Sequence, residues 1–266
     1  MRDAGSRMPV VFFGHGSPMN ALERNRYTEA WRRVGRSVPE PKAVLSISAH
    51  WYVRGTQVTA MPTPPTIHDF GGFPKELFEV EYPAPGDPTL ATGVRDLLAP
   101  LPVGLDADWG LDHGTWSVLV HAFPETDVPV VQLSLDRSQP PPFHYDLGRR
   151  LRPLREQGVL IVGSGNVVHN LRAADWTPGV APYDWAASFN ERVRDHVARR
   201  VHGPLVAYEA LGEEARLSVP TPDHYLPFLY ALGLQEPDEP IWFATDGIEL
   251  GSVGMLTAVI GTVAAR

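Results

Sequence analysis

The alternation of short apolar runs with segments of helical spacing constrains the fold of this chain more than any other feature. Apolar runs rich in β-branched residues lie at 9–13, 43–48, 128–135 and 158–164. Their length, their composition and their neighbouring glycines favour strand over helix. Because strands that alternate with helices form a mainly parallel sheet with helices on both faces, the sequence predicts an α/β fold with a single central sheet.

The segments between these runs carry helix signals. We expect a helix to begin at Asp87, one to end at Gly158, one to cover 183–201 and one to begin at Thr221. The first and the last have proline directly after the capping residue, and the third has amphipathic spacing. The stretch from Ile241 onward indicates two further strands, for which an antiparallel pairing is one option.

The charge balance argues against nucleic acid or membrane as a partner. The chain has 266 residues with 23 basic and 31 acidic side chains, a net charge of −8, and it contains no run rich in lysine or arginine. Nucleic acids and anionic membranes are bound chiefly by clustered positive charge. We therefore expect neither as a partner, and we expect a monomer or a small homo-oligomer.

The chain has no cysteine, which excludes disulfides, thiolate metal ligands and a cysteine nucleophile. Any metal must therefore be held by His, Asp or Glu. The first residues contain no apolar segment of signal-peptide length, and no stretch approaches the ~18 apolar residues of a membrane span. The expected localisation is cytoplasmic.

The segment 60–88 is rich in proline and has little periodicity. A loop of this length inside a compact domain is usually either functional or disordered. Its aromatic side chains argue against disorder, so we interpret it as an ordered wall over a site. The aromatic residues concerned are Phe70, Phe73, Phe78 and Tyr82.

Histidines follow three of the predicted strands. His15, His50 and His169 each come shortly after one of the apolar runs. Ligands of an open parallel sheet bind at the carboxyl ends of its strands, which share one edge. We therefore expect these imidazoles to meet there, and Gly14 and Gly16 beside His15 allow a close backbone approach and unusual φ angles. The alternative is that each histidine caps or hydrogen-bonds its own loop.

Other histidines are weaker candidates for the same cleft. His113 lies at a predicted turn before a helix, and His224 lies in the first turn of the helix expected from Thr221. His68, in the proline-rich segment, is a further candidate. The remaining ones are expected to be structural: His121, His144, His196 and His202.

Neutral imidazoles without cysteine suit Zn, Fe, Ni or Cu. Two or three histidines with open coordination positions are typical of a catalytic metal centre, whereas a structural zinc site has four protein ligands. The sequence contains no Walker A, GxSxG or HExxH motif. The imidazoles are therefore the strongest indication of chemistry in this chain.

The motifs "GHGSPMN", "SAHW", "PPTIHDFGGFP", "YPAPG", "DHGTW", "GSGNVVHNL" and "PTPDHYLP" together resemble the 4,5-DOPA extradiol dioxygenase family. This family is a branch of the class III (LigB-type) extradiol ring-cleaving dioxygenases. The similarity runs in order from about residue 8 to about residue 260. It implies one domain over 1–266, with a core of about 8–262 and one non-haem metal at the carboxyl edge of the strands.

The resemblance also implies residue roles. By it, His15 and His50 are metal ligands and His224 matches the later ligand position. His169 matches the histidine that moves protons in the wider class, close enough to the metal to act as a fourth ligand. His113 matches a histidine that contacts substrate or bound oxygen.

The implied reaction inserts both atoms of O2 into a catechol-type substrate such as DOPA, a small aromatic diol, with 4,5-cleavage of the ring. The implied cofactor is one divalent metal ion, with Fe(II) expected for turnover and Zn(II) as an ion that the same ligands can hold. The partners would be this aromatic diol and O2.

One departure from the wider class leaves the ligand set open. That class completes its set with a carboxylate, for which Asp223 and Glu249 are the candidates here, so the site is either all-histidine or two histidines with one acid. Two other functions also stay open: a zinc-dependent hydrolase that uses the same histidines, and a non-enzymatic binding protein on this fold.

Overall fold

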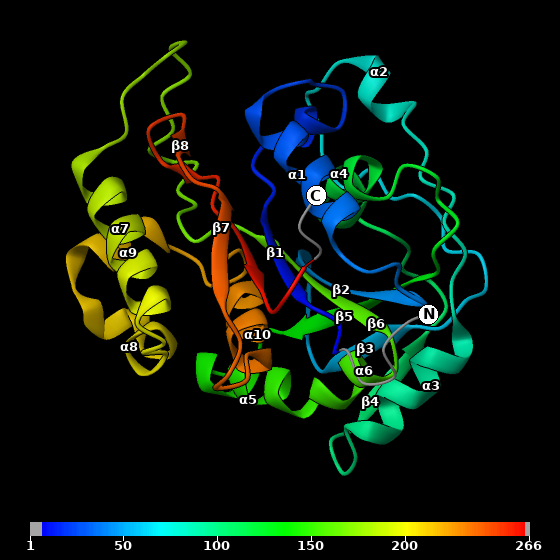
Figure 1. Ribbon diagram of the computed structural model, residues 1–266. Helices are drawn as coiled ribbons and strands as arrows, with labels where there is room; N and C mark the ends of the chain where they lie inside the picture. The colour runs from blue at the N-terminus through cyan, green and yellow to red at the C-terminus, as the bar shows by residue number, and fades with distance from the viewer. Residues whose placement is uncertain (1–6, 264–266) are drawn as a thin grey trace.

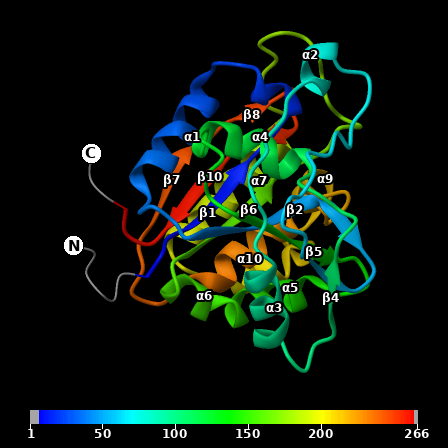
Figure 2. The same ribbon diagram turned by 90° about the vertical axis from the view of Figure 1, so that its right-hand side faces the viewer.

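The computed structural model describes residues 7–263, and its centre is an eight-stranded sheet in the order β4-β3-β5-β2-β6-β1-β10-β7. The strands at the middle of the sheet run parallel to one another (Figures 1 and 2). They are β1 (Val10–Gly14), β2 (Ala43–Val53), β5 (Val130–Asp136) and β6 (Val159–Gly165). The four apolar runs are therefore the four middle strands, and the predicted α/β fold is confirmed.

The strands at the edges are shorter or antiparallel. On one side β3 (Thr56–Thr59) pairs antiparallel with β5 and parallel with β4 (Val103–Asp106). On the other side β10 (Thr257–Ile260) pairs antiparallel with both β1 and β7 (Ile241–Thr245), as the antiparallel option anticipated. A separate hairpin joins β8 (Ile248–Glu249) to β9 (Val253–Gly254).

Helices cover both faces of the sheet because successive strand residues point to opposite sides. In β1, Val10 and Phe12 pack into one core, while Val11 and Phe13 pack into the other. The second core is covered by α1 and α4, and the first by α10, α5, α6 and α3 with α7 beside them (Figures 1 and 2). Their bounds are α1 (Arg26–Ser37), α3 (Pro88–Leu97), α4 (His113–Ala122), α5 (Pro141–Arg150), α6 (Arg152–Glu156), α7 (Asp184–Ala198) and α10 (Leu226–Leu234).

Short helical turns connect these elements. They are η1 (Pro18–Ala21), α2 (Lys75–Phe78), α8 (Gly203–Val206), η2 (Tyr208–Leu211) and α9 (Glu213–Ser218). Among residues 7–263, no helix is both long enough and apolar enough to cross a membrane.

Prolines set two helix boundaries that the sequence analysis misplaced. A helix beginning at Thr221 would carry Pro227 in its interior, where the ring clashes with the carbonyl four residues earlier. The helix instead begins at Leu226 with Pro227 in its first turn, so His224 lies in the turn before the helix. Pro153 likewise divides the helical stretch that ends near Gly158 into α5 and α6.

Candidate active site

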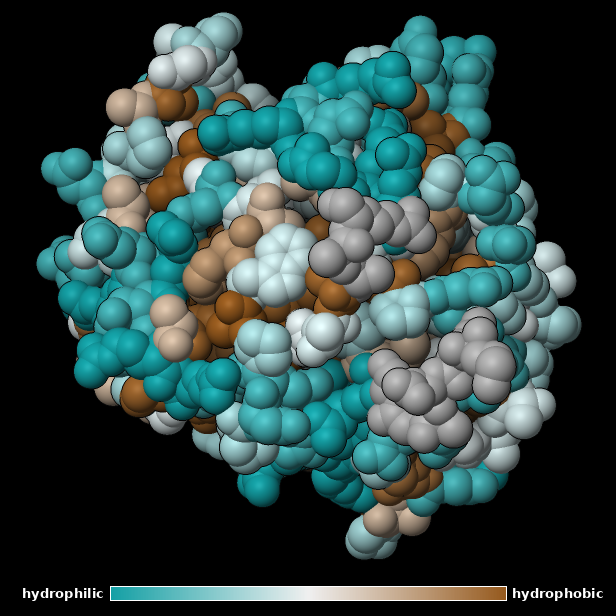
Figure 3. Space-filling model, in the orientation of Figure 1, coloured by the Kyte–Doolittle hydropathy of each residue, from teal (hydrophilic) through white to brown (hydrophobic). Residues whose placement is uncertain are grey.

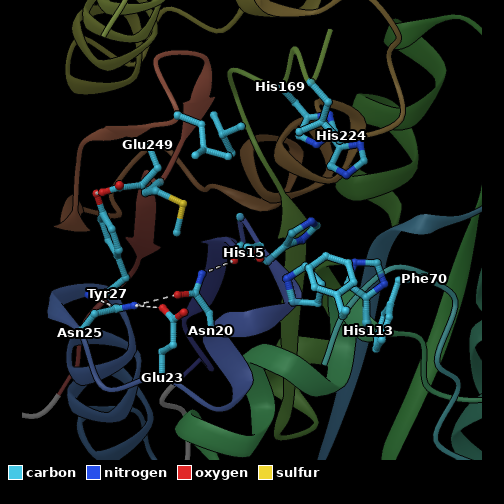
Figure 4. A pocket seen from close by; sticks show the side chains of 18 of the residues that line it. His15, Asn20, Glu23, Asn25, Tyr27, Phe70, His113, His169, His224 and Glu249 are labelled. Carbon is cyan, nitrogen blue, oxygen red and sulfur yellow. Dashed lines mark hydrogen bonds between the residues drawn. The ribbon is translucent and has the colours of Figure 1, made fainter. Parts of the chain in front are cut away.

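A cavity of about 640 Å³ lies beyond the carboxyl ends of the middle strands. In the orientation of Figure 1 the molecular surface is notched at the top, between the side that carries β8 and the side that carries α2 (Figure 3). The structure brings together here five of the six histidines considered for this cleft from the sequence, and His68 is not among them. The five are His15, His50, His113, His169 and His224, and four of them are labelled in Figure 4.

His15 follows β1 directly, and its side chain is almost fully buried. A Cβ atom on Gly14 would come within 2.6 Å of the Leu256 carbonyl oxygen, and Gly16 has a φ of +61°, so both flanking positions require glycine. The Nδ1 atom of His15 lies 2.9 Å from the Ser164 hydroxyl oxygen. Because that hydroxyl donates to the Gly114 carbonyl, it accepts from Nδ1, which leaves Nε2 of His15 with its lone pair.

His50 lies within β2 rather than after it, since the strand continues to Val53. The register of β2 against β5 shifts between Ile47 and Tyr52, and such an irregularity re-aims the side chains that it contains. The Nδ1 atom of His50 lies 3.4 Å from Oδ2 of Asp69, and its Nε2 lies 3.3 Å from Nε2 of His15. Asp69 therefore favours the proton on Nδ1 of His50 and a free lone pair on Nε2.

His113 is the first residue of α4. The turn that the sequence predicted before a helix is therefore the N-terminus of α4. Asp112 caps this helix and is fully buried, where its side chain accepts from the Thr115 amide and the Ser48 hydroxyl. The backbone N–H of His113 donates to Asp69 at 2.8 Å, and its Nδ1 lies 3.0 Å from Oδ2 of the same carboxylate. One carboxylate thus contacts both His50 and His113.

His224 and His169 stack on each other on the far side of the cluster. Their ring centroids are 3.5 Å apart and the planes differ by 7°. The centroid of His224 lies 5.3 Å from that of His15 and 5.0 Å from that of His50. Asp223 contacts Nδ1 of His224, which leaves Nε2 as the free ring nitrogen. The backbone N–H of His169 donates to the Ser218 carbonyl at 2.8 Å.

Burial lowers the pKa of three imidazoles of the cluster, those of His15, His50 and His169. Loss of water, with the charge of neighbouring imidazoles, lowers the pKa of His15 and of His50 well below the usual value. The same two causes lower the pKa of His169 to about 3. Neutral rings are the form that binds a metal or accepts a proton.

The pKa values of the neighbouring carboxyl groups shift in different directions. Burial and the nearby charge of Asp69 raise the pKa of Asp112 to about 6. Partial burial acts to raise the pKa of Asp69 itself, but hydrogen bonds from His113 and the charge of that ring outweigh it, so the pKa is lowered. Asp223 follows the same pattern with His224, and its pKa is lowered as well. Ionised Asp69 and Asp223 therefore lie against the Nδ1 atoms of the imidazoles that they contact.

The donor set fits a divalent cation. His15, His50 and His113 each offer one ring nitrogen, and these nitrogens lie within 4.8 Å of one another. The two facing Nε2 atoms of His15 and His50 both carry lone pairs, an arrangement that a shared cation stabilises. A partner on the other ring nitrogen, as Ser164 and Asp69 provide here, is the usual outer support of metal-binding histidines.

The carboxylates considered from the sequence lie outside this donor group. Asp223 contacts the remote nitrogen of His224. Glu249 lies on the side of the cavity opposite His113, where it accepts a hydrogen bond of 2.6 Å from the Tyr27 hydroxyl (Figure 4). The cluster itself therefore consists of imidazoles.

The proline-rich segment forms part of the cavity wall, as expected for Phe70 and Phe73, which both line it. The ring of Phe70 meets His113 edge-on with centroids 5.4 Å apart. The expectation for Tyr82 is wrong, because this side chain is buried in the core and donates to the Phe123 carbonyl at 2.9 Å. Phe78 does not line the cavity either but packs against Phe70.

Residues 10–261 match the family described as the catalytic LigB subunit of aromatic ring-opening dioxygenase. The chain belongs to this family. Ring-opening dioxygenase is therefore its enzyme class, and the resemblance found in the sequence motifs is confirmed.

Similar proteins include two 4,5-DOPA dioxygenase extradiol enzymes. That of Escherichia coli (strain K12) is 51% identical over 263 residues, which cover 97% of this chain and 96% of the relative. That of Beta vulgaris is 39% identical over 235 residues, which cover 84% and 85%. A crystal structure of an uncharacterized protein from Escherichia coli K12 superimposes with a TM-score of 0.85 at 48% identity, covering 96% of this chain and all of that one.

Four of the five other histidines of this LigB family member have side-chain partners outside the cluster. His68 lies 3.0 Å from the Val80 carbonyl oxygen and packs on Trp116, so it holds the proline-rich segment together. His121 contacts the Asn20 carbonyl, His144 the Tyr230 hydroxyl and His202 the Tyr145 hydroxyl.

Asp69 is the residue of the site that sequence reasoning missed. It follows His68 in a segment without periodicity, and no strand end pointed to it. The available signal was an acid directly before the aromatic residues of the wall, within "HDFGGF".

Proposed function

We propose that this dioxygenase opens a catechol-type substrate such as DOPA by extradiol 4,5-cleavage, with one Fe(II) ion as the working cofactor. The observation that carries the proposal is the cluster of five imidazoles at the inner end of a cavity, three of which keep a free Nε2 because Nδ1 is held by Ser164, Asp69 or Asp223. Imidazoles with open positions beside them suit Fe(II) chemistry. The names of the relatives supply the substrate class.

In this proposal His15, His50 and His224 hold the ion, and His169 stacks on His224 beside them. When bound, the ion supplies Lewis-acid and redox chemistry at a single centre. Zn(II) suits the same ligands but has no redox chemistry. The zinc form is therefore expected to bind without opening the ring.

His169 is assigned the proton transfers. Burial and the neighbouring His224 ring lower its pKa to about 3, so the ring is neutral at pH 7 and can accept a proton from a catechol hydroxyl. The protonated ring is then a strong acid in this environment, which favours return of the proton at a later step. Its stacking on His224 fixes the plane of the ring.

Phe70, Phe73 and His113 are assigned to the aromatic ring of the substrate. The two phenyl rings line the cavity beside His113, and apolar walls of this kind hold an aromatic ring and exclude water. His113 is placed to contact the substrate from the N-terminus of α4.

The cavity has room for more than the ring of a catechol. Its volume of about 640 Å³ lies within the range of sites for drug-sized ligands. The outer end carries the oppositely charged Glu23 and Arg26, which suit the ammonium and carboxylate groups of an amino-acid side chain. This supports a substrate with a charged side chain.

Oxygen uptake tests the proposal directly. Protein loaded with Fe(II) should consume O2 with a catechol that carries an amino-acid side chain and give a ring-opened product that absorbs visible light. Protein loaded with Zn(II), and Fe(II) protein kept without oxygen, serve as controls. Product formation by the zinc form without oxygen would contradict the proposal and favour a hydrolase.

A further inference from the structure

A hydrogen bond on the side of the cavity opposite His113 joins α1 to the β8–β9 hairpin. The hydroxyl of Tyr27, near the start of α1, donates to Oε1 of Glu249 at 2.6 Å (Figure 4). The same hydroxyl accepts from the guanidinium of Arg26, which also lies 3.5 Å from Glu249. Tyr27 is only 4% exposed, although it lies beside a cavity. This buried hydroxyl therefore donates its only proton to Glu249 of the hairpin.

The hairpin in turn holds the segment that contains His169. Glu249 in β8 pairs with Val253 in β9, and Val253 forms an antiparallel bridge with His169 itself. The Gly254 N–H donates to the Val168 carbonyl at 2.8 Å, and the Asn170 N–H donates to the Ser252 carbonyl at 3.1 Å. The backbone on both sides of His169 is therefore bonded to the hairpin that Glu249 anchors.

The segment that contains His169 is also held on its other side, by α9. His169 also donates to the Ser218 carbonyl, and the Asn170 side chain donates to the Leu217 carbonyl, both next to the end of α9. The α9 side fixes one flank of the histidine and the hairpin fixes the other. The hairpin turn has two residues at positive φ, Leu250 at 52° and Gly251 at 71°. Backbone N–H groups of Asp175 and Tyr183 donate to this turn, and the side chain of Glu249 joins the hairpin to α1.

We propose that Tyr27 and Glu249 are positioning residues for His169: their hydrogen bond sets the hairpin, and the hairpin sets the imidazole. The proposal rests on the proton-transfer role given above to His169. Loss of the bond should leave the metal ligands in place and misplace the proton-transfer group. Misplacement of a reacting group by about 1 Å can lower the rate roughly a hundredfold. Because His169 would still be bonded to α9, loss of the hairpin's hold on it should lower the rate roughly tenfold.

The test compares three variants with the native enzyme. Tyr27→Phe removes the donor, Glu249→Ala removes the acceptor, and Glu249→Gln keeps an oxygen that can accept from Tyr27. Tyr145→Phe is the matched control, because Tyr145 lies on α5 outside the cavity lining and its hydroxyl contacts His202. We expect kcat to fall roughly tenfold in the first two variants, with KM within about twofold, and to stay close to the native value in Glu249→Gln and in Tyr145→Phe.

A second measurement reports on the ring without turnover. In protein labelled with ¹⁵N-histidine, Tyr27→Phe and Glu249→Ala should shift the imidazole signals of His169, identified by their loss in His169→Ala. If these signals stay in place and only Tm falls, or if KM rises while kcat is unchanged, the positioning role is wrong. If the native enzyme opens no catechol, the proposed function fails, and the imidazole signals still decide whether the hairpin positions His169.

Discussion

The two ends of the cavity are built differently. At the inner end, buried imidazoles lie on or beside strand ends, and a second group contacts Nδ1 of each proposed ligand ring, as Ser164 does for His15. At the outer end, Glu23 and Arg26 are exposed, and Trp176, on the loop after β6, is 71% exposed. Fixed geometry suits chemistry and adaptable loops suit the recognition of a side chain. With the function proposed above, the inner end would carry catalysis and the outer end selectivity.

Removal of an inner ligand should have the largest effect. His15→Ala or His50→Ala should lose the metal and the activity together, because each removes one of two facing Nε2 donors. Metal content after dialysis and oxygen uptake measure the two losses. His196→Ala, on α7 outside the cavity lining, is the control and should keep both. A fully active His15→Ala enzyme would show that the metal lies elsewhere.

The third ligand can be identified by contrasting two other rings of the inner end. His224→Ala should lose the metal, whereas His113→Ala should keep it and lose turnover. In the structure, ring nitrogens of His15, His50 and His113 lie within 4.8 Å of one another. The geometry therefore also allows His113, in place of His224, to be the third ligand. Metal affinity by chelator competition decides the question. Loss of metal in His113→Ala alone would assign the ligand set to His15, His50 and His113.

Removal of the proton-transfer group should be less severe than loss of the ion. His169→Ala should keep most of the metal and lower kcat by roughly 10²–10⁴, the usual contribution of general acid–base catalysis. Single-turnover and steady-state rates measure the loss. An unchanged rate would remove the proton-transfer role from His169.

Acid should destabilise the inner end of the metal-free protein. The pKa of His169 is lowered to about 3 by burial and by the charge of His224, whereas in an unfolded chain it is about 6.5. Below pH 6.5 the unfolded state therefore binds a proton that the folded state does not, and the free energy of unfolding falls as the pH decreases. Between pH 6.5 and 4 the loss should be about 2–3 kcal/mol for this ring. Urea unfolding should show a flatter pH dependence for His169→Gln, and parallel curves would contradict the lowered pKa.

The sequence predicted the inner end well because parallel strands share a direction. Once the apolar runs were assigned to strands, the carboxyl ends had to meet at one edge, and this placed His15, His50 and His169 together without any knowledge of contacts. The edge strands β3 and β4 were not predicted, since four residues each leave too little pattern to detect.

The outer wall was predicted less well because it consists of loops. The aromatic residues of 60–88 marked an ordered wall, but nothing in the sequence showed that Phe70 faces the cavity while Tyr82 faces the core. The contact of Asp69 with two histidines depends on tertiary structure alone. The start of α10 was misplaced because Thr221 and Pro222 form a valid capping pair, and only Pro227 excludes a helix there.

The smallest effect is expected at the outer end and bears most directly on selectivity. Trp176 lines the cavity mouth and is largely exposed, so its ring can contact only the part of a substrate that extends away from the imidazoles. Loss of one aromatic contact, about 0.5–1.5 kcal/mol, should raise KM by about two- to tenfold in Trp176→Ala and leave kcat unchanged. Trp242→Ala, on β7 outside the cavity lining, is the matched control. The rise in KM should vanish for a catechol without a side chain, whereas a fall in kcat for both substrates would mean that the loop acts on the inner end and that the two ends are not independent.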